Sequence, residues 1–475
     1  MNQVQKIAKN SIVLTLANVA SLLLYLALSI FIARNLGALE FGKWSFAHSF
    51  AFMFAVITQL GIDVLIIRDI AADKDKLKDY FYNGLVIKTL LAVFVFALIV
   101  IIINLLGYPS DTKLVVYIIG AAIIFNSFSR YFYSVFRAFE RMEFEAFLFV
   151  LTALIISVFG LTLLFLGYSI IQIALVVLIA HIITSLLGFY IVKKKFLINH
   201  FRFSYNVSKN IIKKALPFFG VVILGHYLID INGVMLSIMK GNEAVGFYSA
   251  AQKLLISLGV LFLFVNSVFP VMAKFYKTSK QSLFLTYKKT FKYLYILVLP
   301  ISIGTYMLAD KIIFLIYGDQ YINSIIILKI LTFYFLFFSL IGVFIKLLMS
   351  IHRTGTLLKI NAVSVVLLTI SNYIFISNWS YTGLAVSNLI VVFITFIVLF
   401  VYISSKFYKI SFDIFYKPLF PALIMGAVIY ILESMNLFLI IFVSMVVYFG
   451  GLFLTRTFTK EDYRLIRNCF SLKSS

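Results

Sequence analysis

The sequence has little charge, and little of that charge is negative. Only 12% of its 475 residues are charged, and 41 Lys and Arg stand against 18 Asp and Glu, for a formal net charge of +23. A soluble domain has about a quarter charged residues, so this composition argues against a soluble fold. A basic excess on a soluble chain would favour a nucleic-acid partner. Here we expect none, because Lys and Arg collect in the cytoplasmic loops of membrane proteins.

Cysteine is also scarce. The chain has one, Cys469, so no disulfide can form within it. No cluster of His and carboxylates lies beside this cysteine, which argues against a metal site and against a nucleophile. The sequence also has no Walker-type glycine-rich loop, so we do not expect the chain to hydrolyse ATP. The sequence therefore predicts no metal and no cofactor.

Apolar residues are abundant and come in long blocks. They make up 63% of the chain, and they form runs of about 18 or more residues separated by short polar stretches, which is typical of transmembrane helices. We predict an all-α integral membrane protein with about fourteen spans. The spans lie near residues 11–33, 44–67, 84–106, 114–136, 146–166, 170–192, 215–238, 247–271, 291–309, 322–349, 359–377, 382–402, 419–432 and 437–455.

The basic residues predict the orientation of these spans. With the N-terminus inside, most Lys and Arg fall in segments on the inner side of the membrane, as the positive-inside rule requires. Few basic residues fall in the outer loops, namely Arg34, Lys43, Lys113, Lys240 and Lys311. We therefore expect both termini in the cytoplasm and the protein in the plasma or inner membrane.

Two stretches of the sequence repeat each other. GALEFGKWSFA begins at Gly37 and GNEAVGFYSAA at Gly241, and both read G-x4-G-x-aromatic-S-x-A. Two loops built independently from turn-forming residues are the alternative. Six intervening helices leave the halves parallel, which predicts two six-helix bundles as parallel repeats, followed by two more helices and a cytoplasmic tail. The predicted divisions are 1–200, 201–410 and 411–475.

Six stretches of the chain resemble Wzx-type polysaccharide flippases. They are RNLGALEFGKWSFA (34–47), GIDVLIIRDIA (61–71), FRAFERMEFEA (136–146), IDINGVMLSIMKGNEAVGFYSAAQKL (229–254), SVFPVMAKFYKTS (267–279) and HRTGTLLKINAVS (352–364). This family belongs to the multidrug/oligosaccharidyl-lipid/polysaccharide exporter superfamily, which also holds multidrug and toxin extrusion transporters and the lipid II flippase. The resemblance runs from about residue 7 to about residue 405.

The resemblance implies a function as well as a fold. Members of this family move a polyprenyl-diphosphate-linked glycan from the inner to the outer leaflet, so the expected partners are that glycan and the membrane lipids. Whether a proton or a sodium ion is coupled to the movement stays open. The resemblance carries no motif in the last seventy residues or so, and the role of the last two helices is open too.

Asp230 is a candidate for substrate or ion binding. It lies deep in the seventh predicted span, where a charge costs roughly 2.5 to 3.5 kcal/mol to insert and marks a candidate for function. His226 is one turn earlier on the same face, and Lys253 lies at a similar depth in the eighth span. The resemblance places an Asp and a Lys of the family at positions 230 and 253. The residues alone leave another interpretation open, a buried ion pair that only joins the two helices.

Arg130 and Asp63 are the other two candidates. Both lie in the inner third of their predicted spans, and the planar fork of an arginine binds phosphate oxygens in pairs. Arg130 could instead pair with Asp63 or reach the inner interface. Lys88 is close enough to the inner end of its span for its long stem to reach the interface, and we expect His181 to bond to a neighbouring helix.

The leading functional hypothesis is a lipid-linked oligosaccharide flippase that works by alternating access. A drug or metabolite exporter of the same superfamily is an alternative with the same fold. An intramembrane glycan polymerase or acyltransferase is a third hypothesis. It is disfavoured because the outer loops are short and show no clustering of His and carboxylates, so we expect no enzyme activity.

Overall fold

The computed structural model describes residues 3–196, 201, 203–458 and 462. Within these ranges the side chains of residues 3–12, 217, 218, 221, 222, 226 and 260–263 are not described. The described part of the chain is helical and contains no strand. Its elements are α1 (Gln3–Gln59), α2 (Ile62–Ala72), α3 (Lys76–Leu105), α4 (Ser110–Ala138), α5 (Met142–Phe165), α6 (Ile170–Lys195), α7 (Tyr205–Lys240), α8 (Asn242–Ser257), α9 (Val260–Thr278), α10 (Lys280–Met307), α11 (Ala309–Tyr317), η1 (Asp319–Tyr321), α12 (Ser324–Ser350), α13 (Thr354–Lys406), α14 (Asp413–Ile431) and α15 (Leu437–Leu454).

The prediction of a helical membrane protein is confirmed. Ten stretches of helix among the described residues are long and apolar enough to cross a bilayer. The longest of these stretches contain breaks in the helical backbone, so a stretch does not equal a span. The number of fourteen spans therefore stays a prediction.

The longest helices are bent where the backbone leaves the helical region. In α1 the break is at Gly37, whose φ of 79° is one that glycine adopts readily. A second break at Leu60 and Gly61, both with positive φ, separates α1 from α2. α13 breaks in the same way at Trp379 and Ser380. Each of these two long helices therefore holds two helical segments.

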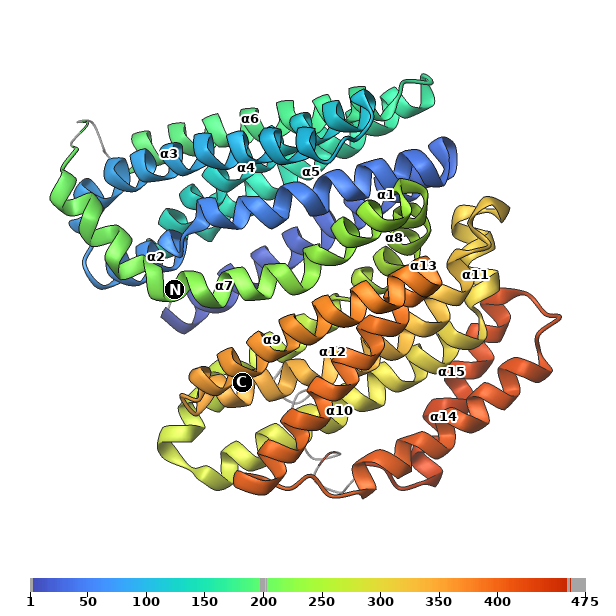
Figure 1. Cartoon of the computed structure of the whole chain (residues 1–475). Coiled ribbons are helices and arrows are strands. Elements are labelled where there is room, and N and C mark those ends of the chain that lie inside the picture. Colours follow the sequence, from blue (N-terminus) through green and yellow to red (C-terminus); the bar gives the residue numbers. More distant parts are fainter. Residues whose placement is uncertain (1–2, 197–200, 202, 459–461, 463–475) are drawn as a thin grey trace. The chain divides into compact units, whose positions relative to one another are not determined.

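The chain divides into two compact units. One unit comprises Met1–Ser257 and Asn361–Leu384, and the other comprises Leu258–Ile360 and Ala385–Ser475. In the first unit α3, α4, α5 and α6 lie as neighbouring helices of one bundle (Figure 1). The divisions at 200 and 410 were predicted from the sequence repeat, and they stay a prediction.

Close packing in the first unit positions α4. Tyr131 of α4 is fully buried, and its hydroxyl donates a hydrogen bond to the carbonyl of Phe81 in α3 at 2.7 Å. A Cβ at Gly84 would lie 2.4 Å from that hydroxyl, so only glycine lets the two helices approach this closely. Small residues are the usual means by which membrane helices pack. The buried side of α4 is thus held by α3, which leaves another face of α4 for a cavity.

The two copies of the repeated motif pack against each other. A Cβ at Gly42 would lie 1.7 Å from the backbone oxygen of Asn242, and a Cβ at Gly246 would lie 1.9 Å from the backbone oxygen of Ala38. In the repeat, Gly42 corresponds to Gly246 and Ala38 to Asn242. Each motif therefore contacts the other through the same two positions, as copies related by a two-fold axis do. This contact joins α1 to α8.

Candidate binding cavity

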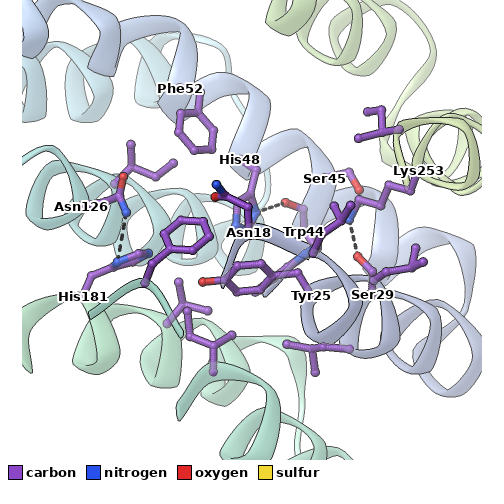
Figure 2. A pocket seen from close by; sticks show the side chains of 18 of the residues that line it. Asn18, Tyr25, Ser29, Trp44, Ser45, His48, Phe52, Asn126, His181 and Lys253 are labelled. Atoms are coloured by element: carbon purple, nitrogen blue, oxygen red, sulfur yellow. Dashed lines mark hydrogen bonds between the residues drawn. The ribbon is translucent and has the colours of Figure 1, made fainter. Parts of the chain in front are cut away.

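The first unit encloses a cavity of about 680 Å³, the main cavity. Its walls come from α1, α4, α5, α6 and α8. Figure 2 shows polar and aromatic side chains that point into it from several of these helices. Those labelled there are Asn18, Tyr25, Ser29, Trp44, Ser45, His48, Phe52, Asn126, His181 and Lys253.

α1 supplies two walls because it breaks at Gly37. Asn18, Tyr25 and Ser29 precede the break at helical spacing and line one side. Ser45 and His48 follow it and line the cavity from the second segment. Sequence reasoning did not single out Tyr25, Ser29, Ser45 or His48. The available signal was the repeat, because Ser45 and its counterpart Ser249 both line the cavity.

α4 presents a polar stripe to the cavity. Asn126, Arg130, Tyr133 and Arg137 follow one another at intervals of four, three and four residues, so they share one face of the helix. At a rise of 1.5 Å per residue the stripe is about 16 Å long. It therefore carries polar groups along about half the thickness of the hydrocarbon core.

The cavity has an excess of positive charge. Among its described lining residues are three cations, Arg130, Arg137 and Lys253, and one carboxylate, Glu145. Arg137 holds both carboxylate oxygens of Glu145, with Nε donating at 2.8 Å. Arg130 is exposed, and it makes no hydrogen bond or ion pair with the described residues. The charges of Arg130 and Lys253 are therefore left to face the cavity.

Lys253 is held by α1. Its Nζ donates a hydrogen bond to the Ser29 hydroxyl at 2.6 Å and lies 4.6 Å from the centre of the Phe41 ring (Figure 2). A hydroxyl and a ring satisfy the ammonium without neutralising it. No carboxylate of the described chain therefore pairs with the Lys253 amine beside the cavity.

Two histidines line the cavity with different tautomers. His48 Nδ1 lies 2.9 Å from the Trp44 carbonyl, which can only accept, so Nδ1 carries the proton. His181 Nδ1 lies 3.3 Å from the amide nitrogen of Asn126 and accepts from it, which puts the proton of a neutral His181 on Nε2. His181 thus bonds to the neighbouring helix α4, as expected, and also faces the cavity (Figure 2).

Asp63 is paired with Lys88 and not with Arg130. The Lys88 ammonium lies 3.2 Å from the carboxylate of Asp63 and 5.6 Å from the centre of the Tyr131 ring. Its side chain is 0% exposed, so the expectation that Lys88 reaches the interface is wrong. The reason is that Asp63, in the first turn of α2, offers a counter-charge inside the bundle.

Asp230 and Lys253 are not brought together. Asp230 is buried in α7 and does not line the main cavity, and Asp230 and Lys253 do not pair with each other among the described residues. Lys253 lies on the face of α8 that packs on α1, so its ammonium reaches Ser29 instead. The side chain of His226 lies outside the described part of the chain.

A separate apolar cavity lies within the second unit. Its volume is about 660 Å³, and α10, α12, α13 and α14 form its walls. Phe333, Phe337, Phe396 and Phe415 line it together with aliphatic side chains. Sequence reasoning did not predict this cavity, because apolar blocks that face lipid and blocks that face a cavity look alike.

The family of the chain follows from its first 276 residues. Residues 7–276 match the family described as polysaccharide biosynthesis protein. The chain belongs to this family. The predicted family resemblance is therefore confirmed, and this family member is a multi-pass membrane protein.

Solved structures share the fold. The chain is similar to the lipid II flippase MurJ in an inward closed conformation, with a TM-score of 0.79 and 17% identity over 94% of this chain and 98% of that one. It is also similar to an inward-facing multidrug resistance MATE family transporter of the MOP superfamily, with a TM-score of 0.65 and 17% identity over 81% and 95% of the two chains. A MOP superfamily transporter from Pyrococcus furiosus has a TM-score of 0.55 at 17% identity, over 84% and 96%. No curated protein sequence matches this chain.

Proposed function

We propose that this protein flips a polyprenyl-diphosphate-linked oligosaccharide from the cytoplasmic to the outer leaflet by alternating access, for assembly of a surface polysaccharide. One observation carries the proposal. The main cavity, which lies within membrane-spanning helices, contains two cations, Arg130 and Lys253, that no carboxylate of the described chain neutralises. Charges in such a place are costly, so a ligand that stabilises them is expected.

A diphosphate is the ligand that fits these charges. The guanidinium of Arg130 can bind two phosphate oxygens at once, and Lys253 adds a point charge on the wall formed by α8. Asp230, His226 and Asp63 stay candidates for binding the substrate or an ion. None of the three lines the main cavity in the described part of the chain, so Arg130 and Lys253 are the first to test.

The other cavity walls suit a glycan. A volume of about 680 Å³ is within the usual range for small-molecule sites. Asn18, Ser45 and Asn126 offer hydrogen bonds to sugar hydroxyls, and Trp44 offers an aromatic face.

The charge of the substrate itself can drive the movement. When a negative charge leaves a cell whose interior is negative, its free energy falls by about 2.3 kcal/mol per 100 mV of membrane potential. Coupling to a proton or a sodium ion would add to this and is part of what a transport assay must resolve. The role we assign to the protein is transport, with no chemical step.

The alternative is a drug or metabolite exporter. The similarity to a multidrug transporter fold favours it, but an organic cation would be repelled by Arg130 and Lys253. The deciding experiment uses the purified full chain in liposomes and follows a fluorescent polyprenyl-diphosphate-linked disaccharide from one leaflet to the other. We expect faster flipping than in empty liposomes. Uptake of an organic cation without any flipping of the lipid-linked disaccharide would overturn the proposal.

A further inference from the structure

A second polar cavity adjoins the main one. It has a volume of about 490 Å³ and lies in the same unit, and we call it the inner cavity. Its walls come from the junction of α1 and α2, from α4 and from α7. Arg130, Tyr133 and Arg137 line both cavities. The two cavities therefore meet along the polar stripe of α4.

Arg130 is the one lining cation of the inner cavity that is left without a counter-charge in the described chain. The carboxylate of Asp63 also lines this cavity, but the buried ammonium of Lys88 neutralises it. Arg137 is neutralised by Glu145. An anion in the inner cavity therefore meets Arg130 and is not opposed by an unpaired carboxylate there.

The walls of the inner cavity combine polar side chains with a larger apolar surface. Gln59, Ser134 and the charged residues form the polar part. Val64 and Ile229, which are 44% and 56% exposed, belong to the apolar part. A phosphate group joined to an isoprenoid chain likewise has a charged part and an apolar part.

The predicted topology puts the inner cavity on the cytoplasmic side. Arg137 is in the last turn of α4, and the predicted topology places that end of α4 inside. The junction of α1 and α2, with Gln59 and Asp63, lies beside it. The substrate of the proposed flippase starts in the cytoplasmic leaflet, so it approaches from this side.

We infer that the inner cavity is the loading site for the diphosphate of the lipid-linked substrate, and that Arg130 transfers this group to the main cavity. The inference rests on the proposed function. It assigns the inner cavity to prenyl diphosphates as a class. Arg130 contacts the diphosphate both when it is loaded into the inner cavity and when it moves to the main cavity.

Gly225 of α7 allows the inner cavity to be filled. It lines this cavity, and a Cβ built on it meets no other atom within 4 Å. Gly225→Leu and Gly225→Trp should fold, since both are better helix formers than glycine, and their side chains should extend into the open space. We expect flipping in liposomes to fall about threefold with Leu and more than about tenfold with Trp.

Gly220 supplies the matched control. It lies in the same helix, its Cβ also meets open space, and it lines neither cavity. Gly220→Trp should flip the substrate like the wild type. Equal losses in the two tryptophan variants, or normal flipping by Gly225→Trp, would overturn the loading site. If the wild type itself does not flip the substrate, the proposed function fails instead.

Thiol labelling tests binding without transport. Because Cys469 is the only cysteine, Gly225→Cys in a Cys469→Ser background carries a single thiol. Farnesyl diphosphate should slow the reaction of this thiol with a maleimide at least fivefold, and farnesol should not. Gly220→Cys should show no protection, and Arg130→Ala should abolish the protection of Gly225→Cys. Absent protection, equal protection by farnesol, or protection that survives Arg130→Ala would contradict the inference.

Discussion

Single side chains decide the charge of the main cavity. Arg130 and Arg137 are two turns apart on α4, yet one faces the cavity alone and the other is bound to Glu145. The difference depends on α5, which brings Glu145 to Arg137 and leaves Arg130 without a carboxylate. A residue-scale test can therefore separate binding from packing.

Replacing Arg130 tests substrate binding. Arg130→Ala should lower flipping at least about tenfold, or about 1.4 kcal/mol, because it removes the cation shared by the two cavities. Arg130→Lys should restore little, since an ammonium cannot bind two phosphate oxygens in one plane. Both variants should reach normal membrane levels, because Arg130 is exposed and pairs with no described residue. Wild-type flipping by Arg130→Ala would remove Arg130 from the site.

The ion pair between Asp63 and Lys88 should matter for stability. Lys88→Met leaves the Asp63 charge without its partner, which we expect to cost up to about 3 kcal/mol and to lower the amount of folded protein. Lys88→Met combined with Asp63→Leu removes both charges and should recover most of that loss. Thermal unfolding of the detergent-solubilised variants measures both effects. A double variant less stable than either single one would contradict a buried pair.

Asp230 and Lys253 should act independently. They do not pair with each other in the described part of the chain, so the effects of Asp230→Asn and Lys253→Gln on unfolding should add to within about 0.5 kcal/mol. Lys253→Gln alone should reduce flipping, because Lys253 faces the main cavity. A double variant more stable than both single variants would show that the two charges do pair.

The sequence selected candidate charged residues within the predicted spans but not the partners of these residues. Depth and spacing were enough to select Arg130, Asp63, Asp230 and Lys253. The partners depend on helix rotation, which hydropathy does not report. Lys253 is the clearest case, because its partner Ser29 is a small hydroxyl in the first predicted span.

At the scale of helices, glycine occurs at the bend in α1 and at the closest contacts between helices. The apolar blocks predicted the positions of most helices. They did not predict the break at Leu60 and Gly61 inside the second predicted span, or the division between α8 and α9 inside the eighth. Both breaks lie within apolar sequence, where hydropathy does not change. The repeat contains the glycines that form the contact between α1 and α8, but the sequence analysis predicted only parallel bundles and not this contact.

The contact between the two motifs should not tolerate a side chain. At an exposed position inside a helix, replacing glycine by alanine stabilises the helix by about 1 kcal/mol. Gly42→Ala should instead destabilise, because its Cβ would lie 1.7 Å from a backbone oxygen that no rotamer change can move. Gly304→Ala in α10 is the control, since its Cβ meets open space. Melting temperatures give the comparison, and equal stability of the two variants would contradict the close contact.

At the scale of the whole molecule, the family and the fold are established and the path of the chain across the bilayer is the main open prediction. The positive-inside pattern predicts this path, with both termini in the cytoplasm. The last two helices, α14 and α15, are short and decide whether the chain has twelve or fourteen spans. α14 contains Pro418 and Pro421, and α15 has 18 residues, about 27 Å of helix against a hydrocarbon core of about 30 Å.

Single cysteines in a Cys469→Ser background can decide the topology. If α14 and α15 both cross, Ser434 between them faces outward, and Ser411 before them faces the cytoplasm. Both positions are exposed, so a thiol there can react. An impermeant maleimide should label Ser434→Cys on intact cells and Ser411→Cys only after permeabilisation. Ser169→Cys and Lys195→Cys at the two ends of α6 calibrate the outer and inner sides in the same way. If the calibrating pair behaves as expected but Ser434→Cys is labelled only in permeabilised cells, α14 and α15 do not cross and the chain has twelve spans. The reason is that a residue between two crossing helices must lie on the outer side when the residue before them lies on the inner side.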